Sequence, residues 1–70
     1  RQVQERLEPL EREIAELEAT VRELTERQAD PAVYREPQQA AAVAREKSSV
    51  EGRLEKLYND WEALVEEPSP

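Results

Sequence analysis

The sequence ADPAVYREP, residues 29–37, separates two long stretches in which apolar residues recur at alternating steps of four and three. Asp30-Pro31 stops one helix and starts another, because proline lacks a backbone N–H but fits the first turn of a helix. The first repeat consists of Val3, Leu7, Leu10, Ile14, Leu17, Val21 and Leu24. The second consists of Ala40, Val43, Lys47, Val50, Leu54, Leu57, Trp61 and Leu64. Each repeat lines one side of an α-helix, so the sequence predicts two coiled-coil helices.

A chain that folds back near Asp30 pairs the two repeats in a single register. In an antiparallel pair of helices, facing residues have numbers with a nearly constant sum, and both repeats satisfy this condition together. The predicted pairs are Leu24 with Val43, Leu17 with Val50, Leu10 with Leu57 and Val3 with Leu64, alternating with Gln28 with Ala40, Val21 with Lys47, Ile14 with Leu54 and Leu7 with Trp61. We therefore predict an all-α fold, an antiparallel two-helix coiled-coil hairpin.

The bend is expected to be a short 3₁₀-like turn, because two prolines stand only a few residues apart. Asp30 can cap the turn that Pro31 opens. Val33 and Tyr34 would then fold back over the end of the seam, the line along which the two apolar repeats meet. The predicted segments are a hairpin over residues 1–67, with a helix over about 3–29, the bend over 30–36 and a helix over about 37–66, followed by a disordered tail over 68–70.

Two residues depart from the helical pattern. Pro9 lies inside the first predicted helix, where a proline costs about 3 kcal/mol, so we expect a kink or a helix start there. Lys47 is the one charged member of the repeats and would face Val21. Its stem can pack while its ammonium group reaches Glu46 or Glu51, or it can fix the register of the helices.

Size and composition exclude several classes of function. The chain has 70 residues, a net charge of −7, and neither Cys nor His. It can form no disulfide or thiolate metal site, and it lacks the most common general base and metal ligand. An enzyme is disfavoured because a two-helix hairpin has little interior in which to perturb a carboxylate. No apolar run approaches the roughly 20 residues that span a bilayer, so we expect a cytoplasmic chain without a membrane segment. We also expect the hairpin to be monomeric.

Three motifs along the chain match a known family. The first helix carries the pattern Leu-x-x-Leu-x-x-x-Ile-x-x-Leu from Leu7, the bend reads Asp-Pro-x-x-Tyr, and the second helix closes with Tyr-x-x-Trp-Glu-x-Leu. The bend and closing motifs are carried by Asp30, Pro31, Tyr34, Tyr58, Trp61 and Leu64. Taken together, these motifs resemble the C-terminal coiled-coil domain of ABC-F ATPases, and within that class the Uup type.

The resemblance implies that two ATP-binding cassettes precede this segment in a longer protein that has no transmembrane domain. The first residue is Arg1 and the repeat already begins at Val3, so we expect the chain to be part of a longer protein. ATP and Mg²⁺ would be bound in the cassettes, with no cofactor in this segment. Members of the class act in the cytoplasm, largely on ribosomes and translation, and the hairpin of the Uup type can contact DNA.

Basic residues gather near the bend of the predicted hairpin. The candidates for contact with nucleic acid are Arg22, Arg27, Arg35, Arg45 and Lys47. Clustered Lys and Arg give affinity for phosphates, whereas the net charge of −7 opposes it at long range. These residues can instead form ion pairs with Glu23, Glu26, Asp30, Glu36 and Glu46. Tyr34 and Trp61 can stack on bases, although rings at a bend or seam more often pack against the protein.

Two interpretations of the function remain open. In the first, the chain is the C-terminal accessory arm of a soluble, duplicated-cassette ABC-F ATPase and contacts DNA or ribosomal RNA through its bend end. In the second, it is a purely structural or protein–protein coiled-coil module, a spacer, regulator or dimerisation element without nucleic-acid binding.

Overall fold

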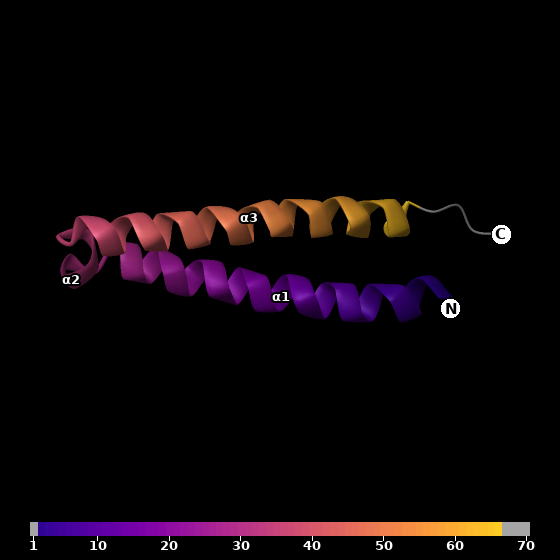
Figure 1. Ribbon diagram of the computed structural model, residues 1–70. Helices are drawn as coiled ribbons and strands as arrows, with labels where there is room; N and C mark the ends of the chain where they lie inside the picture. Colours follow the sequence, from indigo (N-terminus) through magenta and orange to yellow (C-terminus); the bar gives the residue numbers. More distant parts are fainter. Residues whose placement is uncertain (1, 67–70) are drawn as a thin grey trace.

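The computed structural model describes residues 2–66, with side chains from Gln4 onward. Helix α1 spans Gln2–Gln28, α2 spans Pro31–Tyr34 and α3 spans Pro37–Val65. Helices α1 and α3 lie side by side, α2 stands at one end, and the start of α1 lies near the end of α3 (Figure 1). The fold is thus all-α, with two long helices packed against each other. The tail predicted over 68–70 lies outside the described residues.

Helix α1 continues through Pro9 without interruption from Gln2 to Gln28. The helix does not start at Pro9, so of the two alternatives expected there the start is wrong and the kink stays a prediction. Pro9 is exposed, and so is Glu5, whose carbonyl group would have accepted the missing hydrogen bond and can bind water instead. Leu7 and Leu10, on either side of the proline, are half-buried, so packing against α3 sustains the helix across it.

The bend is built as an α-helical turn with a cap. Asp30 has an extended backbone, and its Oδ1 accepts a hydrogen bond from Ala32 N at 3.0 Å, which confirms the predicted cap ahead of Pro31. Tyr34 N donates to Asp30 O at 3.0 Å and Arg35 N donates to Pro31 O at 3.1 Å, both with α-helical spacing. Bonds of 3₁₀ spacing stand beside them, from Val33 N to Asp30 O at 2.9 Å and from Glu36 N to Val33 O at 3.0 Å. Because α2 itself is an α-helix, the expectation of a 3₁₀-like bend is corrected to an α-helical turn with 3₁₀ bonds beside it.

The buried core lies next to the bend. Leu24, Val33 and Val43 are 3%, 7% and 2% exposed, and the half-buried Val50 packs against them. Leu24 and Val43, which the numbering predicts to face each other, belong to the same cluster. Along the stem, by which we mean the two long helices away from α2, most seam residues are only half-buried. Leu54, 6% exposed, is the buried exception on the stem. Elsewhere two helices alone leave part of each seam side chain exposed, whereas α2 adds a third wall at the bend.

Lys47 is half-buried and bonds across the seam. Its Nζ donates to Gln28 Oε1 at 3.1 Å. The expectation that its ammonium group reaches Glu46 or Glu51 on its own helix is therefore wrong. Helical side chains lean toward the N-terminus of their helix, and for α3 this direction leads to the bend, where α1 ends with Gln28.

Candidate functional site at the bend and along the seam

The predicted basic residues surround the bend end of the molecule. Arg22 and Arg27 lie in the last two turns of α1, Arg35 is the C-cap of α2, and Arg45 lies in the third turn of α3. All four arginines are exposed, whereas Lys47 is half-buried with its ammonium group bonded in the seam. Five successive residues rotate about 140° around a helix axis, so Arg22 and Arg27 point to different sides of α1. The arginines therefore share one end of the rod without forming a single surface.

One ion pair joins the two long helices. Arg53 Nη2 lies 2.5 Å and Arg53 Nε lies 3.2 Å from Glu13 Oε2. It is the only ion pair among the side chains that the structure describes. Among the described side chains, the bend-end arginines therefore do not form the ion pairs with neighbouring carboxylates that the sequence allowed.

Charge is divided unequally along the rod. Residues 20–50, which include the bend, carry five basic and five acidic side chains, so this end is neutral. The whole net charge of −7 therefore belongs to the rest of the chain. A negatively charged polymer is repelled by the stem and meets no net repulsion at the bend.

The turn at α2 points Val33 inward and Tyr34 outward. Val33 is 7% exposed and belongs to the core, whereas Tyr34 is 53% exposed. Neighbouring residues of a helix point about 100° apart, so a single turn cannot bury both side chains. The prediction that both fold over the seam is correct for Val33 and wrong for Tyr34. The Tyr34 ring is open to solvent, as stacking on a base would require.

Two aromatic side chains of α3 reach across to glutamates of α1. Trp61 Nε1 donates to Glu11 Oε2 at 2.9 Å, and the Tyr58 hydroxyl donates to Glu18 Oε2. Trp61 is half-buried, so it packs as predicted while its N–H is bonded. Sequence reasoning did not identify either acceptor. The available signal was their seven-residue spacing, which keeps Glu11 and Glu18 on one edge of the seam.

The contact with Glu18 changes the acidity of Tyr58. The hydrogen bond to the carboxylate raises the pKa of the Tyr58 hydroxyl above its ordinary value, because the carboxylate accepts the phenol proton. Desolvation raises the pKa further, and the negative charge of Glu18 adds to the effect. The neutral phenol is therefore the form that the folded chain favours.

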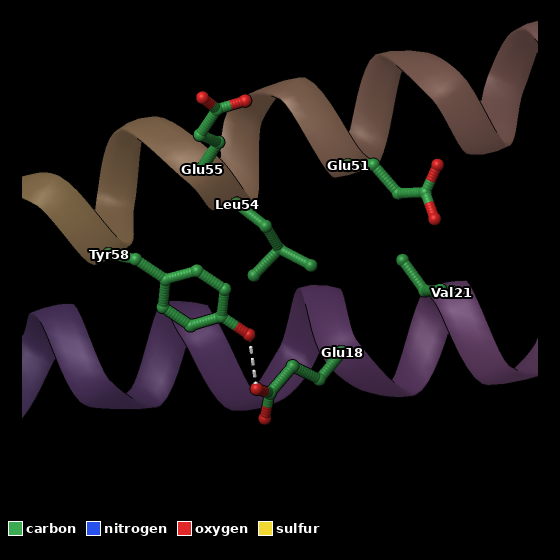
Figure 2. A pocket seen from close by; sticks show the side chains of 6 residues that line it. All are labelled: Glu18, Val21, Glu51, Leu54, Glu55 and Tyr58. Atoms are coloured by element: carbon green, nitrogen blue, oxygen red, sulfur yellow. Dashed lines mark hydrogen bonds between the residues drawn. The ribbon is translucent and has the colours of Figure 1, made fainter.

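An open groove follows this edge of the seam, which we call the Tyr58 edge. One hollow of about 360 Å³ is lined by Glu18, Val21, Glu51, Leu54, Glu55 and Tyr58. A second, of about 280 Å³, is lined by Glu11, Ile14, Ala15, Glu18, Tyr58 and Trp61. Leu54 points from α3 toward α1 between Tyr58 and Val21 (Figure 2). Glu13 and Arg53 each stand five residues from a Tyr58-edge residue, about 140° around their helices, so their ion pair closes the opposite edge.

Other kinds of site are not formed within the part of the chain that the structure describes. No three His, Cys, Asp or Glu side chains there gather closely enough to hold a metal ion. None of the helices described has the length and apolar character needed to cross a membrane.

Two long packed helices joined by a capped helical bend define an all-α module. Residues 1–66 match the ABC transporter C-terminal domain, and the chain therefore belongs to that family. A C-terminal accessory domain of this kind is in general non-catalytic. No curated protein and no solved structure matches the chain.

Proposed function

We propose that the chain is the C-terminal accessory arm of a soluble, cytoplasmic ABC-F ATPase with two cassettes, and that its bend end contacts nucleic acid, either DNA or ribosomal RNA. Family membership supports the accessory role. The resemblance of the bend and closing motifs to the Uup type supports the assignment to ABC-F. ATP and Mg²⁺ would be bound by the cassettes and not by this segment.

The observation that carries the proposal is the exposure of Arg22, Arg27, Arg35 and Arg45 around a neutral end of an otherwise acidic rod. A guanidinium group that is not held in an ion pair keeps its N–H donors for phosphate oxygens. The exposed ring of Tyr34 lies at the same end and can stack on an unpaired base. Because the stem repels phosphate, the proposed contact is made end-on.

A salt titration tests the proposal. Labelled duplex DNA and structured RNA are titrated with the chain by fluorescence anisotropy between about 50 and 200 mM salt. Log K for duplex DNA falls with log salt by about 0.9 for each neutralised phosphate. Replacing Arg27, Arg35 and Arg45 together by Ala should weaken binding and reduce the magnitude of that slope by up to about three.

The matched control replaces Arg6, Arg12 and Lys56, which are exposed on the stem, by Ala. Both triple variants lose three positive charges, so long-range repulsion changes equally in the two. Only the bend-end variant should lose affinity. Absence of binding at low salt, or equal loss in both variants, excludes the proposed contact.

A structural or protein–protein role is the second candidate, and the open groove with its half-buried seam favours it. If the chain dimerises through the seam, sedimentation equilibrium will give an apparent mass that rises with concentration. A lone hairpin stays near one chain mass.

A further inference from the structure

We propose that the groove along the Tyr58 edge docks a basic, amphipathic helical segment of a partner protein. The groove lies on the stem, whereas the proposed nucleic-acid contact lies at the bend. The inference therefore stands whether or not the bend binds nucleic acid.

The apolar surface of the groove has a helical repeat. Val21 and Leu54 line the first hollow, and Ile14 and Trp61 line the second. On each helix, the residue that lines one hollow stands seven positions from the residue that lines the other, which corresponds to about 10.5 Å along the axis. A helix that presents apolar side chains seven residues apart can place one in each hollow, the spacing used in helix-in-groove recognition.

The polar rim of the groove carries one sign of charge. Both hollows are bordered by glutamates, namely Glu11, Glu18, Glu51 and Glu55, and neither is lined by Lys or Arg. Among the described side chains, Glu51 and Glu55 have no hydrogen-bond or ion-pair partner. Figure 2 shows both on α3 beside Leu54. The next position on this edge of α1 after Glu18 is Arg22, four residues on, and there the acidic rim ends.

Charge selects the occupant of the groove. A second copy docked here would bring together two stems, and the stem together with the chain ends carries the whole net charge of −7 of each chain. The same glutamates repel nucleic acid. A segment with Lys or Arg flanking its apolar residues instead satisfies both the rim and the apolar lining.

The test uses the 70-residue chain and a synthetic amidated helical peptide of Lys, Gln and Leu, with leucines placed seven residues apart. A control peptide has the same charges with every Leu replaced by Ala. The readouts are anisotropy of the labelled peptide and the fluorescence of Trp61, the only tryptophan, which lines the second hollow. The Leu peptide should bind at least about tenfold more tightly than the Ala peptide, because burial of one Leu can supply that factor.

Variants locate the site on the chain. Ala15→Phe fills the second hollow, and Ala19→Phe makes the same change on the exposed outer face. Glu51→Lys with Glu55→Lys reverses the rim, and Glu16→Lys with Glu23→Lys changes the net charge equally on exposed positions outside the groove. Each groove variant should weaken binding at least about tenfold relative to its control, as the loss of one buried contact does. Helical circular dichroism shows that each variant is folded.

Several results overturn the proposal. Equal affinity for the Leu and Ala peptides, or equal loss in the two charge variants, shows attraction to net charge alone. Peptide binding without a change in Trp61 fluorescence places the peptide elsewhere. Concentration-dependent mass in sedimentation, abolished by Ala15→Phe, shows that a second copy fills the groove instead.

Discussion

Replacing Val43 with Ala removes two methyl groups from the side chain with the lowest exposed fraction in the core, 2%. Each buried group of this size contributes about 0.8 kcal/mol, so the lost transfer free energy is about 1.6 kcal/mol. The cavity left beside Leu24 and Val33 adds to this loss. We expect the free energy of unfolding to fall by about 2 to 3 kcal/mol, a large share of the stability of a domain this small.

The assay is urea unfolding followed by helical circular dichroism, with Val65→Ala as the matched control. Val65 is 49% exposed, so the same chemical change there should cost less than about 0.5 kcal/mol. In a thermal scan, the Val43 variant should unfold at a temperature roughly 10 to 20 °C lower than the parent chain. Equal losses for the two variants would refute the assignment of the core to the bend.

Two further predictions concern Tyr58 and Asp30. In a Tyr34→Phe background, phenolate absorbance reports Tyr58 alone and should titrate with a pKa above the ordinary value of about 10, and Glu18→Gln should lower that pKa. The raised pKa stabilises the fold below about pH 10, and this stabilisation is lost as the pH rises through the folded-state pKa. Urea unfolding at stepped pH measures the loss. An unchanged titration midpoint of Tyr58 in Glu18→Gln contradicts the hydrogen bond. Asp30→Ala should cost about 1 kcal/mol in urea unfolding because Ala32 N loses its acceptor. Asp60→Ala, on an exposed face of α3, is its control, and equal effects would count against the cap.

Much of the fold can be predicted because helical periodicity depends only on spacing. The two apolar repeats predict two long packed helices, and Asp30-Pro31 predicts the break between them. Pro9 misleads because the free-energy cost expected for it is that of a proline inside a helix with no access to water. Pro9 and Glu5 are exposed, so the Glu5 carbonyl group that lacks its N–H donor can bind water. Lys47 misleads because its side chain extends along α3 toward the bend, where it reaches Gln28 and not a glutamate of its own helix.

Less of the candidate site can be read from the sequence. The bend-end arginines are evident as residues, but acidic and basic positions alternate there, so the pattern alone allows both ion-paired and exposed arginines. The rotation of one helical turn decides that Val33 is buried and Tyr34 is exposed. The bonds from Tyr58 and Trp61 depend on how two rings cross the seam, which residue spacing does not specify.

The crowding of Leu24, Val33 and Val43 around α2 gives the molecule a direction of assembly. These residues are close in sequence, so bringing them together closes a short loop at low entropic cost. The two helices of the stem can then pair progressively, starting from this cluster. Opening follows the reverse order, because the least covered contacts let go first. A force applied to the two chain ends therefore separates the helices progressively from that end, and the cluster at α2 is the last part to unfold.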